Sequence, residues 1–336
     1  IGIPVQSTTS DAFTPPYNHE GTDYYALSWN EVNEQYDPIT TTGFTMDIVG
    51  QGFAIPSSSA RTLHFDGILN TSTTTWSGLT YTGTNSAPGF HLLGNPYTAA
   101  IDLLSASTTL TNLHLNIWYP TGGGNFALYD IDNTLGINGG TQYIPAMQGF
   151  WVYVMSGLTG TMEVTTEALS HQGTSVYKSA QDNILRIELA GNNLTDEAAI
   201  IFRSNAQVGY DLYDTPKKFA TNDLYPQVYF NVEEENLAIN ALCSINESLT
   251  IPLGIQINSS GTYTLSATNI KDLFTYSDIY LEDTYTGNII DLNIQNQYTF
   301  ESDVVNSSNR FNILFGKEGV TGIDNSKQTV QIYAFN

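Results

Sequence analysis

The chain has 336 residues, enough for two ordinary domains, and 41% of them are hydrophobic, so it can bury a core. It carries 33 acidic side chains against 10 Lys and Arg, a formal net charge of −23. This balance argues against binding to nucleic acid or to anionic lipid, because both need a basic surface. Only 13% of the residues are charged, whereas Tyr, Thr, Ser and Asn are abundant, which is typical of a β protein facing the outside of the cell.

The first part of the chain reads as an arm followed by a β domain. Residues 1–23 are rich in Pro, Thr and Ser and predict an N-terminal arm, and residues 24–170 predict the first domain. Gly43–Val49 alternates apolar and polar side chains, as a half-buried strand does. Thr98–Ser105 is the best helix candidate of this half. Further strands are expected at Tyr24–Trp29, Arg61–Phe65, Thr73–Thr82, Leu113–Trp118, Phe126–Tyr129, Phe150–Val154 and Gly160–Thr166.

The second part repeats the pattern after a break. Residues 171–183 are polar and aperiodic and predict a linker, and residues 184–316 predict the second domain. Ile279–Glu282 and Asn288–Leu292 flank Asp283–Gly287, a hairpin loop with Gly at its end. Other strands are expected at Ile184–Leu189, Ala198–Phe202, Val228–Val232, Ala238–Leu242, Leu249–Ile257, Gly261–Ala267, Tyr298–Phe300 and Arg310–Phe315.

Many short strands joined by polar turns indicate an all-β fold, with two consecutive antiparallel β-sandwich domains of the jelly-roll or immunoglobulin-like kind. After Gly316 the pattern fades into a linker, and Thr329–Phe335 starts a new strand.

The stretch Gly89–Tyr97 runs from apolar residues into Gly94-Asn95-Pro96. Gly, Asn and Pro each interrupt a strand for a different physical reason. We expect a core strand that stops abruptly, with Gly94, Asn95 and Pro96 serving backbone geometry. Gly149, at the end of the tight turn Pro145–Gly149, is assigned the same structural role.

Two acidic clusters are candidate Ca²⁺ sites. Asp130, Asp132 and Asn133 form the first, and Asp211 and Asp214 the second. Alternate carboxylate and amide oxygens in a loop can converge on Ca²⁺, but solvated turns use the same residues, and the first cluster lacks the closing Glu of a helix-loop-helix site. Both interpretations stay open.

Among the four tryptophans, Trp76 lies between Thr and Ser and is expected to be exposed, so it is the candidate for binding a ligand such as a sugar ring. Trp118 and Trp151 stand in apolar runs and are expected in the core. The sequence contains no His-Glu-x-x-His motif, no Gly-x-Ser-x-Gly motif and no Gly-rich phosphate loop that opens a helix.

Large secreted surface proteins of the Bacteroidota carry the stretch G-W-N-L-x-G-N-P-Y-P-S-A-I-D, which Gly89–Asp102 resembles. Tyr143–Val152 is similar to the I-P-P-x-Q-G-F-F-V segment of the same family. Phe90-His91 departs from the usual Trp-Asn. The resemblance spans Tyr24 to Gly316 and includes, in the second half, Leu185–Leu189, Asp196–Phe202, Gly209–Asp211, Asp214, Ile279–Asp283 and Asn309–Phe311.

Export by the type IX secretion system is what this resemblance implies, with a C-terminal sorting domain after a linker that contains Thr-Gly-Ile. Thr321-Gly322-Ile323 and Val330–Phe335 match that linker and the first strand of the sorting domain. Residues 317–336 are therefore predicted to be a linker and the start of a sorting domain.

We expect a non-catalytic extracellular surface module that acts in adhesion or surface assembly, either anchored to the outer membrane or released. Its expected partners are cell-surface or extracellular polysaccharides or proteins, or further copies of itself, without nucleic acid and without membrane insertion. Two alternatives stay open. One is a carbohydrate-binding module of a secreted polysaccharide-degrading protein, and the other is a hydrolase, because a glycosidase needs only two carboxylates about 5–10 Å apart.

Overall fold

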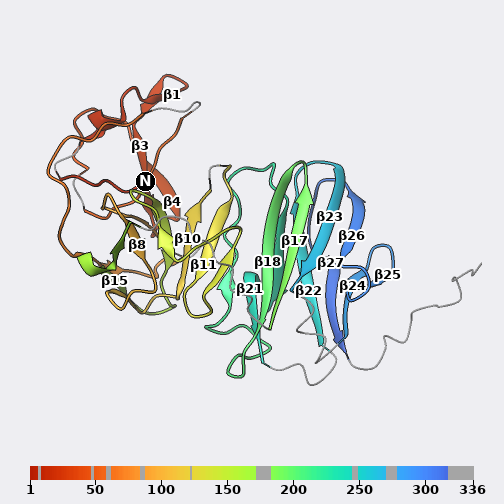
Figure 1. The fold of residues 1–336 in the computed structure, drawn as a ribbon. Coiled ribbons are helices and arrows are strands. Elements are labelled where there is room, and N and C mark those ends of the chain that lie inside the picture. The colour runs from red at the N-terminus through yellow and green to blue at the C-terminus, as the bar shows by residue number, and fades with distance from the viewer. Residues whose placement is uncertain are drawn as a thin grey trace, which may run out of the picture. The chain divides into compact units, whose positions relative to one another are not determined.

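The computed structural model describes residues 1–6, 9–46, 49–57, 62–83, 88–121, 123–171, 183–243, 249–269 and 278–316. The chain divides into unit 1, Ile1–Ser179, and unit 2, Ala180–Asn336 (Figure 1). Residues 172–182 of the predicted linker and the whole predicted sorting-domain segment, residues 317–336, lie outside the described residues. The described residues contain no α-helix, only the 3-10 turns η1 (Ser10–Phe13) and η2 (Thr166–Ala168).

Unit 1 consists of small sheets. The first part holds the hairpin β1-β2 and the sheet β4-β3-β5, and the second part holds the sheets β12-β11-β10-β14-β7, β13-β8-β16 and β6-β15-β9. The strands are β1 (Tyr17–His19), β2 (Thr22–Tyr24), β3 (Ala26–Asn30), β4 (Gln35–Ile39), β5 (Phe53–Ala54), β6 (Thr74–Leu79), β7 (Phe90–Gly94), β8 (Ala100–Asp102), β9 (Thr108–Thr111), β10 (Asn116–Pro120), β11 (Phe126–Asp130), β12 (Leu135–Ile137), β13 (Tyr143–Ile144), β14 (Gly149–Tyr153), β15 (Gly160–Val164) and β16 (Leu169–Ser170).

Among the residues of unit 1 that the structure describes, two hydrophobic clusters stand out. The larger one gathers alternate residues of β7, β14 and β10, among them Leu93, Phe150 and Ile117. Alternation places every second side chain on the same face of a sheet, which is why strands with this pattern can share a core. The smaller cluster surrounds Phe13 and Phe53.

The segment predicted as an N-terminal arm, residues 1–23, contributes to this second cluster. Ile3 and Val5 are 6% exposed and Phe13 is fully buried. A stretch without periodicity therefore still supplies core residues to unit 1.

The helix predicted at Thr98–Ser105 is wrong. Ala100–Asp102 is strand β8, in which Ile101 is fully buried and pairs with Ile144 of β13 and Leu169 of β16. Local helical preference is weak compared with tertiary pairing, so two neighbouring strands decide the conformation of this short segment.

Unit 2 is one large sheet with the order β25-β24-β27-β22-β20-β21-β18-β17-β23-β26, and β19 adds to β21 (green to blue in Figure 1). Its strands are β17 (Ile184–Gly191), β18 (Leu194–Phe202), β19 (Thr215–Pro216), β20 (Gln227–Val232), β21 (Glu235–Leu242), β22 (Leu249–Ile257), β23 (Gly261–Thr268), β24 (Asp278–Asp283), β25 (Asn288–Asp291), β26 (Gln297–Ser302) and β27 (Val305–Gly316).

One core fills unit 2, with side chains from most of its strands, such as Leu185, Ile200, Phe230, Ile255 and Phe311. Because strands from all along the sheet face the same core, the sheet wraps around it as a sandwich that approaches a barrel. The predicted all-β class with antiparallel sandwich architecture is confirmed. One pairing departs from it, since β18 and β21 are parallel.

Candidate functional site

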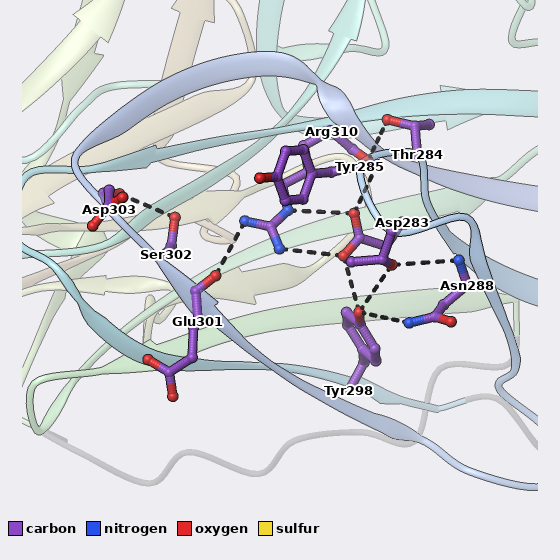
Figure 2. Close-up of polar contacts among 10 residues, drawn as sticks. Asp283, Thr284, Tyr285, Asn288, Tyr298, Glu301, Ser302, Asp303 and Arg310 are labelled. Atoms are coloured by element: carbon purple, nitrogen blue, oxygen red, sulfur yellow. Dashed lines mark hydrogen bonds and ion pairs between the residues drawn. The ribbon is translucent and has the colours of Figure 1, made fainter.

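The most concentrated polar site of unit 2 lies between strands β24, β27 and β26 (Figure 2). We call Asp283, Arg310 and Tyr298 the edge cluster, since they come from the two ends of the sheet order. Arg310 donates from Nη2 and Nε to the Asp283 carboxylate at 3.2 and 3.4 Å, and the Tyr298 hydroxyl donates to it at 2.9 Å. These side chains connect β26 to β24 and β27. The backbone of β26 pairs with neither of these two strands.

The edge cluster keeps a buried carboxylate in its charged form. The Asp283 carboxylate is fully buried, and the Arg310 side chain is 13% exposed. Burial would raise the pKa of the Asp283 carboxyl, but the hydrogen bonds from Arg310 and Tyr298 outweigh it and hold this pKa below its usual range. Arg310 also lies 4.4 Å from the ring centroid of Phe300 and 4.9 Å from that of Phe311, so its guanidinium is packed as well as paired.

A second buried ion pair joins Lys217, next to β19, to Asp196 of β18. The Lys217 Nζ and Asp196 Oδ2 atoms are 2.5 Å apart, and both side chains are at most 3% exposed. The backbone N–H of Val228 also donates to this oxygen at 2.8 Å. A charge buried this deeply is tolerated because it is paired and hydrogen-bonded.

In unit 1 the buried carboxylate of Glu31 has a similar structural role. It accepts hydrogen bonds from the backbone N–H groups of Thr82, Gly83 and Gly89 at 2.7, 3.0 and 3.0 Å, and from the hydroxyls of Thr80 and Thr82. Burial raises the pKa of Glu31, but these bonds prevail and lower it to about 2. The carboxylate therefore anchors a turn and is not available as a proton donor at neutral pH.

The first predicted Ca²⁺ cluster is a hydrogen-bonded turn. Asp130 is 2% exposed, and its carboxylate accepts from the backbone N–H of Asn133 at 3.0 Å and from the Asn133 side-chain amide at 2.6 Å. Asp132 points into an exposed position beside it. These contacts explain the spacing of the residues, because the Asp130 side chain closes the turn by accepting from the backbone and the side chain three residues on.

The second predicted Ca²⁺ cluster also binds backbone. Asp214 is fully buried and accepts from the N–H groups of Ala241 and Asp211 at 2.8 and 2.7 Å. Asp211 accepts from Gln207 and Tyr213 N–H at 2.8 Å each. Burial raises the pKa of Asp214 to about 7. Within the described residues, no group of three or more His, Cys, Asp or Glu side chains could hold a metal ion.

The structural residues of the Gly94-Asn95-Pro96 turn all lie in the interior. The Asn95 side-chain amide contacts the carbonyls of Ala99, Ile144 and Pro145 at 3.0, 3.1 and 2.8 Å, and its Oδ1 accepts from Tyr97 N–H at 3.0 Å. Asn95 is fully buried, and Pro96 is buried beside it. One side chain thus ties the end of β7 to two other segments.

Gly94 and Gly149 face each other across β7 and β14. A Cβ on Gly94 would lie 2.4 Å from the Cα of Gly2, and one on Gly149 would lie 2.8 Å from the Ile1 nitrogen. Both positions need glycine because another backbone segment crosses them closely.

The predicted exposure of Trp76 is wrong. Trp76 is 6% exposed, packs at 6.0 Å against the ring of Phe150, and donates from Nε1 to the Gly50 carbonyl at 2.6 Å. The alternation of β6 turns Thr74 and Trp76 inward and leaves Thr75 outside. The sugar-binding role proposed for this residue has no exposed ring to use. Trp118 and Trp151 are buried as predicted, at 1% and 3% exposed.

Unit 1 also contains an open cavity of about 340 Å³ with polar walls, formed by Thr9, Asp11, Ala12, Thr14, Thr62, His64 and Asp66. The Asp11 carboxylate is engaged by the Thr9 hydroxyl at 3.1 Å and by Gly43 N–H at 3.3 Å. The sequence offered no sign of this cavity, since its residues come from two segments without a common motif.

These observations define an all-β protein of two units whose buried charged groups are tied to structural partners. The chain belongs to the family described as "Domain of unknown function (DUF8693)", which matches residues 2–315. It is similar to the minor fimbrium subunit Mfa5 of Porphyromonas gingivalis, with 22% identity over 308 residues that cover 82% of this chain. The chain spans 24% of the length of that subunit. No solved structure matches it. No helix in the described ranges is long and apolar enough to cross a membrane.

Proposed function

We propose that the chain is a non-catalytic extracellular module that acts in adhesion or surface assembly and reaches the cell surface by type IX secretion. The observation that carries the proposal is the similarity to a fimbrial subunit along 82% of the chain. It agrees with the broader resemblance to surface proteins of the Bacteroidota. The secretion route rests on the resemblance of Tyr24–Gly316 to these proteins and on the match of Thr321-Gly322-Ile323 and Val330–Phe335 to the linker and first strand of a sorting domain.

The chemistry of the described residues supports a module without catalysis. Asp283, Asp196 and Glu31 are buried carboxylates, and each is bound to a cation or to backbone donors. A general acid or base needs instead a group of perturbed pKa that faces a substrate cavity. Asp214 has a raised pKa, but it is fully buried and bound to backbone N–H groups.

The test uses beads coated with the complete chain and an equally acidic control protein. We expect the coated beads to adhere to bacterial or host surfaces, or to one another, above the control. Immunogold labelling of intact cells should find the protein outside the outer membrane, and a strain without type IX secretion should retain it inside. Beads that bind nothing and do not aggregate would refute the adhesive function, whereas unchanged export from the secretion mutant would refute only the route.

A further inference from the structure

Tyr285 stands out among the exposed apolar side chains of unit 2. It is 84% exposed at the tip of the turn between β24 and β25. A tyrosine ring combines a large apolar surface with a polar tip, and leaving it in water forgoes the gain from its burial. Such residues are enriched where a protein binds a partner.

The turn that carries Tyr285 is held in one conformation. Its own backbone N–H donates to the Asp283 carboxylate at 3.1 Å, and Gly287 N–H donates to the Asp283 carbonyl at 2.8 Å. The backbone N–H and the hydroxyl of Thr284 both donate to the Arg310 carbonyl, at 2.8 and 2.9 Å. An aromatic ring on a fixed turn loses little conformational entropy when a ligand binds.

The edge cluster also orients the ring. The Arg310 guanidinium lies 5.5 Å from the centroid of the Tyr285 ring, within the range of a cation–π contact, and Figure 2 shows the two side chains next to each other. Since Arg310 is bonded to Asp283, its role toward Tyr285 is to position the ring. The charge of Arg310 is already compensated and offers little to a second anion.

Polar groups follow Tyr285 in the same turn and the strand after it. Asn288 donates from Nδ2 to the Tyr298 hydroxyl at 3.3 Å, and the Thr286 hydroxyl lies 3.4 Å from the same oxygen. All these contacts are long, so they yield easily to a better partner. An exposed ring with hydroxyl and amide groups on the same turn matches a sugar ring, which has a C–H face and hydroxyls along its edge.

We infer that Tyr285, with Thr286 and Asn288 beside it, forms a binding surface for neutral glycan chains. Neutral glycans fit the charge of the molecule, because the formal net charge of −23 repels sulfated or uronic acid polymers. The inference rests on the proposed adhesive function and names its ligand class. A fixed turn with a single exposed ring suits weak contacts that gain strength when many copies are displayed together.

The test compares Tyr285→Ala, Tyr285→Phe and Ile294→Ala in the complete chain, by native affinity electrophoresis in gels that contain laminarin, yeast mannan, xylan, dextran or, as an anionic probe, polygalacturonate. Ile294 is a matched control, since it is 85% exposed in the neighbouring connection between β25 and β26. We expect at least one neutral polysaccharide to retard the wild type. Tyr285→Ala should weaken this binding about tenfold, equivalent to about 1.4 kcal/mol, while Tyr285→Phe and Ile294→Ala bind as the wild type does.

Retardation by none of the neutral polysaccharides, or an equal loss in Tyr285→Ala and Ile294→Ala, would overturn the inference. Bead adhesion separates this result from a failure of the proposed function. If wild-type beads bind cells and periodate oxidation of the cell-surface sugars abolishes binding, the glycan inference is supported. If binding survives periodate but is lost after protease treatment, the partner is a protein, so the glycan inference fails and the adhesive function stands. Equal unfolding temperatures of the variants show that none of them is misfolded.

Discussion

Removing Arg310 tests whether the edge cluster stabilises unit 2. In Arg310→Met the fully buried Asp283 carboxylate keeps only the Tyr298 hydroxyl and the Tyr285 N–H as donors. Breaking a buried ion pair by removing one partner costs roughly 3–5 kcal/mol. We expect about 3 kcal/mol, the lower end, because the bonds of 3.2 and 3.4 Å are long and the Arg310 side chain keeps 13% exposure.

A second ion pair serves as a matched control and shows whether burial or bond length decides the loss of stability. Arg186 and Glu197 form a shorter pair at 2.7 Å, but their side chains remain 11% and 16% exposed. In Arg186→Met the carboxylate of Glu197 can reach water, so this change should cost only about 1 kcal/mol. The double variant Asp283→Asn with Arg310→Met should be more stable than the sum of the single changes predicts, by roughly 1–2 kcal/mol.

Urea and thermal unfolding, followed by far-ultraviolet circular dichroism, would measure these differences. A loss of about 3 kcal/mol in a unit of this size corresponds to a fall in Tm of roughly 6–12 °C. All four tryptophans lie in residues 29–151, so their fluorescence reports unit 1 and should change little. The reasoning is refuted if Arg186→Met costs as much as Arg310→Met, or if the effects of the two edge-cluster changes simply add.

Three further predictions concern single buried groups. Asn95→Ala removes the donors of three carbonyls and the acceptor of Tyr97 N–H, and should cost about 3 kcal/mol or more in urea unfolding; a loss under 1 kcal/mol would contradict the role of Asn95. Burial lowers the pKa of His114 from 6.5 to about 4, so the unfolded chain binds more protons at this site between these values, and the contribution of His114 to stability should fall by roughly 3 kcal/mol as pH drops from 6.5 to 4. His114→Phe should therefore lose less stability than the wild type as pH falls over this range, and an unchanged pH dependence would show that His114 does not contribute to it. For Asp214 the sign is opposite, because its folded pKa of about 7 lies above the ordinary value of 3.8, so its contribution to stability is lost as pH rises toward 7. In Asp214→Asn stability should therefore climb more steeply with pH between 4 and 7 than in the wild type, as checked by urea unfolding at several pH values.

Strand positions in unit 2 were predictable because alternation is a local signal. Ile184–Leu189 was predicted as a strand and lies in β17, and the predicted hairpin around Asp283–Gly287 appears as β24 and β25. The burial of Asp283 was not predictable. It depends on Arg310 and Tyr298, whose sequence distances from Asp283 are set only by the pairing of β24 with β27 and by the closure of the sheet.

The exposure of Trp76 was predicted wrongly from its neighbours in the sequence. An aromatic residue among Thr and Ser looks exposed when only its neighbours are counted, but Thr74, Trp76 and Leu79 share the buried face of β6. Strict alternation over the whole segment would not have placed Trp76 inside, because Leu79 lies three residues further on, and the two are buried together only through the register shift between β6 and β15. Tyr285, in contrast, follows the end of a strand, and the turn that exposes it was visible in the sequence although its role was not.

The Gly94-Asn95-Pro96 turn, which carries part of the resemblance to Bacteroidota surface proteins, does not carry the proposed binding. Asn95, Gly94 and Gly149 face other backbone segments at distances that leave no space for a ligand. Such a turn can stay constant while exposed turns vary, because loops tolerate substitution better than buried hydrogen bonds do. The β24–β25 turn combines both properties: its base, Asp283 and Arg310, is as fixed as the interior, and its tip, Tyr285, is open to a partner. Differences in ligand among related surface proteins should then lie at turn tips of this kind, above an unchanged base.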